Sequence, residues 1–144
     1  MDASASVPDA AQRTPSLAAV AKVTPLRLLL VEDDSSSLET LGRLLRRDGH
    51  HVIAAASVSD ATASAESHEF DLVISDIGLP DGSGTELMAT LRDKHGLRGV
   101  ALSGYGMEDD LERTRKAGFV THLVKPIQIA ELRRVLATLG PARV

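Results

Sequence analysis

Five short aliphatic runs alternate with helix-like segments along this chain, and this alternation restricts the fold more than any other feature. The first run lies in residues 26–31 and the third in residues 71–75, and neither exchanges polar and apolar positions regularly. Buried parallel strands have this continuous aliphatic character. Strands that alternate with helices indicate a parallel sheet with helices on both faces. The sequence therefore predicts an α/β fold, a doubly wound sheet of five parallel strands flanked by five helices.

The boundaries of these elements follow from apolar spacing and from capping residues. Asp34 or Ser35 can cap the first helix and Gly49 ends it, while Ser57 and Asp60 form a capping box for the second. Asp34 is therefore interpreted as a structural residue. The expected strands are residues 26–31, 51–55, 71–75, 100–102 and 122–124, and the expected helices are 36–47, 57–67, 84–94, 108–117 and 128–139.

The length of the chain predicts a single domain. Its 144 residues and 43% hydrophobic content suffice for one buried core. Residues 1–24 are rich in Ala, Ser, Pro, Asp and Thr and show little apolar periodicity, so we expect a disordered N-terminal tail. The folded domain is expected to cover residues 25–140, and residues 141–144 a short C-terminal tail.

Composition excludes several classes of function. The net charge of −4 gives no support for binding nucleic acid, and Arg43, Arg46 and Arg47 have the spacing of a solvated helix face. The chain has no cysteine, no signal-peptide pattern and no apolar stretch near the roughly 18 residues of a membrane span. The five histidines lack metal-ligand spacing. We therefore expect a cytoplasmic protein without a nucleic-acid or membrane partner.

Acidic residues follow two of the expected strands. Glu32 and Asp33 come after the first strand, and Asp76 comes after the third. In open α/β sheets, ligands bind beyond the carboxyl ends of the strands. Three carboxylates gathered there would repel one another unless a cation lies between them. Oxygen ligands of this kind suit Mg²⁺, with Asp33 and Asp76 as direct ligands and Glu32 as holder of a coordinated water.

Two further strand ends carry a hydroxyl and a lysine. Ser103 follows the fourth strand, where neighbouring glycines permit close approach of the backbone. Lys125 and Pro126 follow the fifth strand, where an X-Pro bond can be cis and fix a tight turn. A lysine in this place can reach toward a phosphoryl group as a point charge. Acids, hydroxyl and lysine together predict a phosphoryl-transfer site built around Mg²⁺.

Four short motifs occur in a fixed order along the chain. They are Leu30-Val31-Glu32-Asp33-Asp34, Asp76 with Leu79-Pro80-Asp81-Gly82-Ser83-Gly84, Leu102-Ser103-Gly104, and Lys125-Pro126. Through these motifs residues 26–139 closely resemble the receiver domain of two-component response regulators. The resemblance implies a flavodoxin-like fold with strand order 2-1-3-4-5.

The resemblance also implies a role for each site residue. Asp76 would accept a phosphoryl group from the phosphohistidine of a sensor histidine kinase or histidine phosphotransfer protein. Glu32, Asp33, Asp76 and the backbone carbonyl of Gly78 would hold Mg²⁺. Lys125 would pair with the phosphoryl oxygens and Ser103 would hydrogen-bond them. Such a protein accepts and loses a phosphoryl group and is not a multiple-turnover enzyme on an external substrate.

Signalling in this family implies a conformational switch. Phosphorylation would draw Ser103 inward and alter the surface formed by the fourth helix, the fifth strand and the fifth helix, which would bind an unknown downstream protein. Receivers usually carry Tyr or Phe where this chain has His122, so His122 and Tyr105 are the candidate switch residues. Gly78 has no side chain to guide or block an attacking water.

Two other classes of function stay open at this stage. A Mg²⁺-dependent phosphatase of related fold would need a second acid at the position of Gly78 and a cap insertion, and the sequence has neither. A receiver-like binding module that is never phosphorylated usually lacks an acid or the lysine, and all are present here. No output domain is expected after the last helix, so we expect a single-domain response regulator or the receiver of a hybrid kinase.

Overall fold

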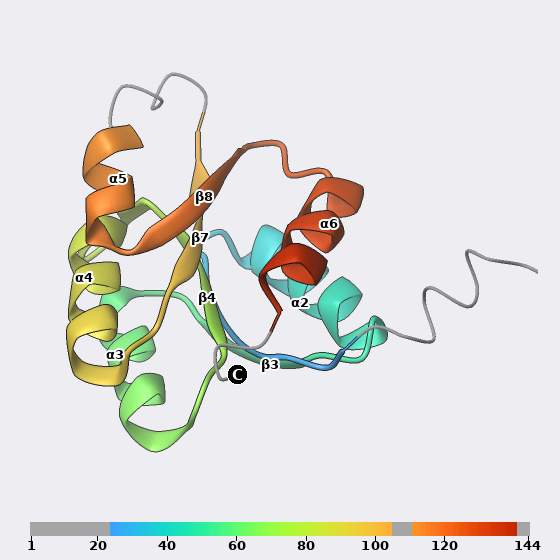
Figure 1. The fold of residues 1–144 in the computed structure, drawn as a ribbon, viewed down its shortest axis with the longest axis horizontal. Coiled ribbons are helices and arrows are strands. Elements are labelled where there is room, and N and C mark those ends of the chain that lie inside the picture. Colours follow the sequence, from blue (N-terminus) through green and yellow to red (C-terminus); the bar gives the residue numbers. More distant parts are fainter. Residues whose placement is uncertain (1–23, 105–110, 141–144) are drawn as a thin grey trace, which may run out of the picture.

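A computed structural model of the protein describes residues 24–104 and 111–140. Five parallel strands form its central sheet in the order β3-β2-β4-β7-β8 (Figure 1). The strands are β2 (Arg27–Val31), β3 (His51–Ala55), β4 (Leu72–Asp76), β7 (Gly99–Ser103) and β8 (Phe119–Val124). In chain order this arrangement is 2-1-3-4-5, so the predicted fold and strand order are confirmed.

Helices cover both faces of the sheet. They are α2 (Ser35–Arg47), α3 (Val58–Ser67), α4 (Gly84–His95), α5 (Leu111–Ala117) and α6 (Ile129–Leu139). Helices α2 and α6 lie on one face, and α3, α4 and α5 lie on the other (Figure 1). This two-sided cover explains why the strands are aliphatic at successive positions, because both faces of the sheet must be buried.

The two faces of β2 illustrate how the core is built. Leu28 and Leu30 are buried in the cluster that includes α2 and α6, whereas Leu29 and Val31 are buried in the cluster that includes α3 and α4. All four side chains are completely inaccessible to solvent. Burial of one such side chain contributes about 1.5–3 kcal/mol to folding. The strand is thus fixed in place from both sides, and with it the residues at its carboxyl end.

Local capping fixes where the helices begin. Asp34 caps α2 as predicted, its carboxylate accepting a hydrogen bond from the backbone N–H of Ser37 at 2.9 Å. Ser57 caps α3 as predicted, its hydroxyl accepting from the backbone N–H of Asp60 at 3.1 Å. Helix α4 ends at Gly96, whose φ of 68° is the left-handed conformation that glycine tolerates.

Several predicted boundaries need correction. Strand β4 includes Asp76 as its last residue, and β7 extends to Ser103. Strand β8 begins at Phe119, three residues before the predicted start at His122. It is an edge strand whose exposed Val120 interrupts the aliphatic pattern. The turn-rich segment after Asp76 contains a hairpin that was not predicted, formed by β5 (Gly78–Leu79) and β6 (Gly82–Ser83).

Three predictions fall partly or wholly outside the described residues. They concern the switch residue Tyr105, the first residues of the helix predicted for 108–117, and the pair of tails predicted at the two termini, residues 1–24 and 141–144. Within the part of the chain that the structure describes, no helix is long and apolar enough to cross a membrane.

Candidate functional site

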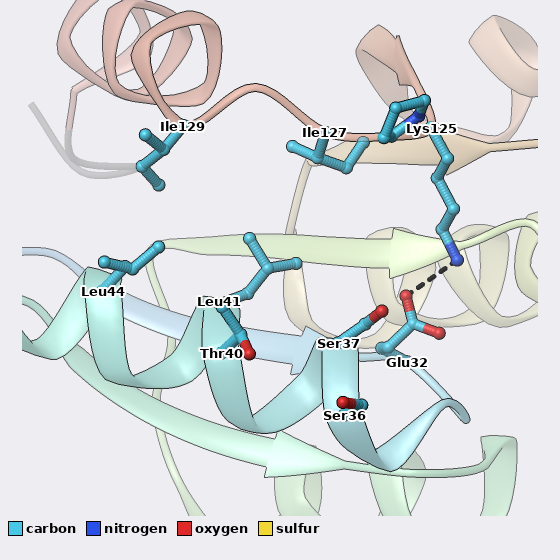
Figure 2. A pocket seen from close by; sticks show the side chains of 10 residues that line it. Glu32, Ser36, Ser37, Thr40, Leu41, Leu44, Lys125, Ile127 and Ile129 are labelled. Carbon is cyan, nitrogen blue, oxygen red and sulfur yellow. Dashed lines mark ion pairs between the residues drawn. The ribbon is translucent and has the colours of Figure 1, made fainter.

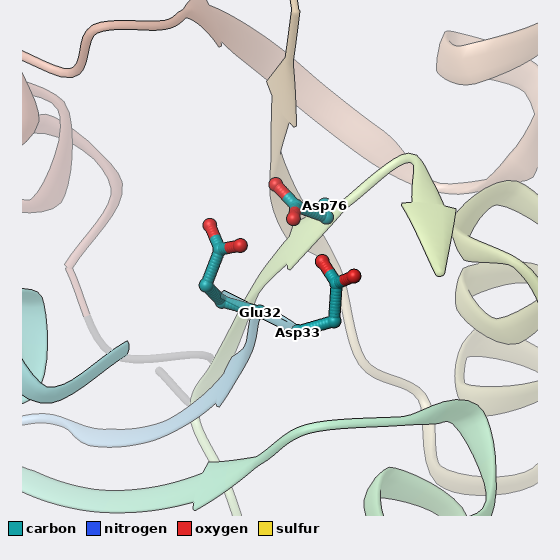
Figure 3. Close-up of side chains that lie close together, drawn as sticks. All are labelled: Glu32, Asp33 and Asp76. Atoms are coloured by element: carbon teal, nitrogen blue, oxygen red, sulfur yellow. The ribbon is translucent and has the colours of Figure 1, made fainter. Parts of the chain in front are cut away.

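The structure brings the three predicted acids together at the carboxyl edge of the sheet. Glu32 directly follows β2, and Asp76 ends the adjacent strand β4. Glu32 and Asp76 are buried, with exposed fractions of 0% and 5%, while Asp33 is exposed. One carboxylate oxygen from each lies within 4.8 Å of the others, and Figure 3 shows the three side chains converging. The register of β2 and β4 therefore places a concentrated negative charge at this edge.

Lys125 reaches the same cluster from the end of β8. Its Nζ lies 2.8 Å from Oε1 of Glu32 and 2.8 Å from Oδ1 of Asp76 (the contact with Glu32 is drawn in Figure 2). Its backbone N–H donates to the carbonyl of Ser103 at 2.8 Å. The following bond to Pro126 is cis, in agreement with the predicted tight turn. One lysine thus faces two buried carboxylates.

The balance of charge is visible in the pKa values. Burial, together with the hydrogen bond and the charge of Glu32, raises the pKa of Asp76 to about 7, although Lys125 acts in the opposite direction. Burial would also raise the pKa of Glu32. Hydrogen bonds with Asp76, Lys125 and the backbone N–H of Asp34 outweigh it and lower that pKa. Without a further cation, Asp76 holds its proton for part of the time near neutral pH.

The donor set fits a divalent cation with a preference for oxygen. Glu32, Asp33 and Asp76 offer carboxylate oxygens, and Mg²⁺ binds through such groups while keeping several waters. Gly78 lies exposed on the hairpin that follows, and a Cβ built on it would meet no atom within 4 Å. Space and negative charge are therefore both present where the sequence predicts Mg²⁺.

Ser103 supplies a buried hydroxyl beside the acids. It ends β7 with an exposed fraction of 1%, next to Leu102, which pairs with Asp76 in the sheet. Among the described residues its Oγ has no hydrogen-bond partner. Leaving a buried polar group unpaired costs about 1–3 kcal/mol, so this hydroxyl is available to an acceptor that enters the site.

The backbone of Asp76 is fixed by a glycine that the sequence analysis did not interpret. A Cβ on Gly84 would lie 1.9 Å from the carbonyl oxygen of Asp76, a distance that no real contact allows. The first turn of α4 can therefore pack against the end of β4 only because residue 84 is glycine. In the sequence, only the short distance between the end of the strand at Asp76 and the start of the next helix at Gly84 could have indicated this close packing.

Comparison with known proteins agrees with this geometry. The family model of the response regulator receiver domain matches residues 28–137. This chain belongs to the receiver family. The resemblance predicted from the four motifs is therefore confirmed.

Curated relatives place the receiver in proteins of very different length. The transcriptional regulatory protein PdtaR of Mycobacterium tuberculosis is 34% identical over 75% of this chain, which spans only 53% of PdtaR. The sensor histidine kinase AruS of Pseudomonas aeruginosa is 37% identical over 83% of this chain, which spans 12% of AruS. The polar-differentiation response regulator DivK of Brucella ovis is 30% identical over 80% of this chain, and the match spans 97% of DivK.

A solved receiver structure extends the comparison to three dimensions. The response regulator TrrA of Thermotoga maritima, solved in complex with Mg²⁺ and BeF, superposes with a TM-score of 0.71 at 28% identity. The match covers 79% of this chain and 98% of TrrA. The architecture described above is thus that of an experimentally determined receiver.

Beside the acidic cluster this receiver has a cavity of about 590 Å³ between α2 and the segment that follows β8. Glu32 and Lys125 lie at one end of it, and Leu44 and Ile129 lie at the other (Figure 2). The other lining residues are Ser36, Ser37, Thr40, Leu41, Pro126 and Ile127. The cavity therefore joins an apolar groove to the charged site.

The predicted switch residue His122 lies in β8, opposite Ala101 of β7, and is half-buried. It lines a second cavity of about 280 Å³ together with Leu111 and Thr114 of α5. In this receiver, His122 thus borders a cavity between β8 and α5. Tyr105, the other candidate, lies outside the described residues.

One histidine has a structural role that sequence reasoning missed. His50 is buried, and its Nδ1 accepts a hydrogen bond from the backbone N–H of Leu26 at 3.0 Å. Leu26 lies 24 residues away in sequence. Only the position of His50, directly before the second strand, could have indicated the contact.

Proposed function

We propose that this receiver accepts a phosphoryl group on Asp76 from the phosphohistidine of a sensor histidine kinase or histidine phosphotransfer protein. The observation that carries the proposal is the ion pair between Asp76 and Lys125. Asp76 belongs to the acidic cluster with Glu32 and Asp33, and the buried hydroxyl of Ser103 on the adjacent strand has no partner among the described residues. Phosphoryl transfer requires mainly positioning and neutralisation of charge. Membership in the receiver family supports the phosphoacceptor role. We propose residues 25–140 as the receiver unit.

In the reaction, an ionised carboxylate oxygen of Asp76 attacks the phosphorus atom of the phosphohistidine. The O–P bond forms as the P–N bond breaks, and its electron pair remains on the imidazole, which leaves neutral when its other nitrogen carries a proton. The products are an acyl phosphate on Asp76 and a free histidine on the partner. The Asp76 carboxylate must be deprotonated for this step, and the positive charge of Lys125 favours that form.

The remaining residues would bind the cation and the transferred group. Glu32, Asp33, Asp76 and the carbonyl of Gly78 would hold Mg²⁺, which supplies positive charge that neutralises the phosphoryl oxygens. Lys125 would keep its ion pair with Glu32 or turn toward a phosphoryl oxygen. Its pKa is raised by hydrogen bonds with Asp76 and Glu32, although burial acts against this, so it remains an ammonium group at neutral pH.

The response would begin at Ser103. Its hydroxyl would donate to a phosphoryl oxygen and thereby gain the partner that it lacks among the described residues. Because Ser103 accepts from the backbone of Lys125 through its carbonyl, a movement of β7 would reach β8 and His122. We propose that the altered surface of α5, β8 and α6 binds a downstream protein.

Labelling by a small phosphodonor tests the assignment. Incubation with acetyl phosphate and Mg²⁺ should add one phosphoryl group by intact-protein mass spectrometry, and neither Asp76→Asn nor the wild type in chelator should be labelled. Unchanged labelling of Asp76→Asn would overturn the proposal. Absence of labelling in the wild type would favour the binding module, and steady turnover of phosphate esters would favour a phosphatase.

A further inference from the structure

The hairpin that follows the acceptor is held at both of its ends. Its strands pair Gly78 with Ser83 and Leu79 with Gly82. At the far end, the hydroxyl of Ser83 caps α4 by accepting from the backbone N–H of Thr85 at 3.1 Å. The turn between the two strands carries Asp81, and this residue reaches a different helix.

Asp81 caps α3 across the molecule. Its Oδ1 accepts from the backbone N–H of Val58 at 2.8 Å, and its Oδ2 accepts from that of Ser59 at 3.0 Å. These are the first two N–H groups of α3, which a helix cannot satisfy by itself. Both bonds favour the ionised carboxylate and lower the pKa of Asp81. Each carboxylate oxygen therefore has its own donor, 22 or 23 residues away in sequence.

Two observations connect this cap to the phosphoacceptor site. The hairpin starts two residues after Asp76 and includes Gly78. Its turn also packs on α3, because a Cβ on Gly82 would lie 3.3 Å from Cγ2 of Val58. Helix α3 is anchored in turn by the buried Ala61 and Ala65. The turn of the loop beside Asp76 is thus tied to α3 by the side chain of Asp81 in addition to this packing.

We propose that Asp81 is a positioning residue for phosphoryl acceptance, holding the hairpin of residues 78–83 against α3 so that the loop beside Asp76 is ordered before cation and phosphoryl group arrive. The proposal rests on the proposed function of Asp76. A site that is ordered in advance binds its ligand without a further cost in loop entropy. Asp81 itself touches neither ligand.

A matched pair of variants separates positioning from simple helix capping. Asp81→Ala and Ser57→Ala each remove a cap from the N-terminus of α3, but only the Asp81 cap joins the hairpin to the helix. We expect both variants to lower the melting temperature. In metal-free protein, only Asp81→Ala should speed amide hydrogen exchange in residues 77–84. NMR titration with Mg²⁺ alone should give it a several-fold weaker affinity, because the loop must then be ordered when the ion binds.

The dependence of labelling on Mg²⁺ gives an independent readout. Acetyl phosphate should label Asp81→Ala slowly at low Mg²⁺ and at close to the wild-type rate at saturating Mg²⁺. Asp81→Asn serves as the control for charge, since it loses the same charge as Asp81→Ala but keeps one acceptor oxygen. It should fall between wild type and Asp81→Ala in Mg²⁺ affinity and in hydrogen exchange.

Two results would overturn the inference while leaving the proposed function intact. One is a wild type labelled on Asp76 with Asp81→Ala indistinguishable from Ser57→Ala in Mg²⁺ affinity. The other is equal Mg²⁺ affinity in Asp81→Asn and Asp81→Ala, which would assign the effect to charge alone. A wild type that is not labelled at all would overturn the proposed function and this inference with it.

Discussion

The two edges of the sheet use similar groups in opposite ways. At the amino edge, Asp71 precedes β4 and is buried beside Arg27, the first residue of β2. Its carboxylate accepts from the backbone N–H, Nε and Nη2 of Arg27 at 2.8, 3.3 and 3.0 Å. At the carboxyl edge, Glu32 directly follows β2 and Asp76 ends β4. These two carboxylates share the single ammonium group of Lys125.

The difference lies in how completely the buried groups are satisfied. One carboxylate at the amino edge has three donors from one arginine. Two carboxylates at the carboxyl edge share one lysine, and the pKa of Asp76 is raised to about 7 as a result of burial and of Glu32. An arrangement that costs stability and remains unsatisfied marks a functional site, whereas a satisfied pair serves the fold. The comparison thus separates chemistry from structure within one sheet.

The largest expected effect comes from replacing Lys125 at the carboxyl edge, compared with replacing Arg27 at the amino edge. Replacement Lys125→Ala should slow labelling by acetyl phosphate about a hundredfold, the usual cost of removing one donor that stabilises charge in the transition state. Binding of Mg²⁺ should be largely retained, since Glu32, Asp33 and Asp76 remain. The matched variant Arg27→Ala should be labelled at the wild-type rate per folded molecule. Equal loss in both variants would remove the distinction between the edges.

The next effect concerns stability at the amino edge. Asp71→Ala should lower the free energy of unfolding by about 2 kcal/mol, because it leaves the donors of Arg27 without their buried acceptor. Urea denaturation followed by circular dichroism measures this change. Labelling of the folded fraction should not change. A variant as stable as the wild type would show that this pair does not contribute to the fold.

Much of this comparison could be predicted from the sequence, because the carboxyl edge is marked directly. Each of the acids Glu32 and Asp76 stands at the end of an aliphatic run, and parallel strands bring such ends together. The pair at the amino edge has an equivalent signal that the sequence analysis did not use. Arg27 and Asp71 stand immediately before Leu28 and Leu72, which are paired in the sheet. Opposite charges before neighbouring strands therefore predict an ion pair.

Other features depend on contacts that no local pattern contains. Asp81 is a typical turn residue in sequence, and its role as a cap appears only when the hairpin meets α3. Strand β8 was predicted too short because an edge strand need not be aliphatic throughout, as exposed Val120 shows. Fold and acidic cluster follow from periodicity, whereas the contacts that order the loops follow from tertiary packing.

A smaller effect of opposite sign is expected at the carboxyl edge. In chelator at pH 8, Asp76→Asn should be more stable than the wild type by about 1 kcal/mol, a value kept small because Lys125 offsets part of the cost of the buried charge. The reason is that ionisation of the buried Asp76 opposes folding above its ordinary pKa. Addition of Mg²⁺ should then stabilise the wild type more than the variant. If the variant were less stable than the wild type in chelator, the ionised Asp76 carboxylate would not oppose folding as inferred.

The smallest effect is a dependence of stability on pH that originates at the amino edge. Burial lowers the pKa of His50 below 6.5, the nearby His51 also lowers it, and Asp48 acts in the opposite direction. The neutral ring accepts from the N–H of Leu26, and protonation of Nδ1 would remove that acceptor. A lowered pKa in the folded state means that the unfolded state binds the proton more readily. The contribution of His50 is therefore complete above pH 6.5 and is lost as the pH falls through the folded value.

Two substitutions in adjacent positions isolate this contribution. His50→Asn keeps an acceptor close to the position of Nδ1 but cannot titrate, so its stability should fall less between pH 7.5 and 5.5 than that of the wild type. The difference should stay below about 1 kcal/mol, since one full pKa unit corresponds to about 1.4 kcal/mol. His51→Asn, at an exposed position, should keep most of the wild-type slope. Parallel stability curves for wild type and His50→Asn would show that His50 does not titrate between the two states, so its hydrogen bond with Leu26 would carry no pH dependence.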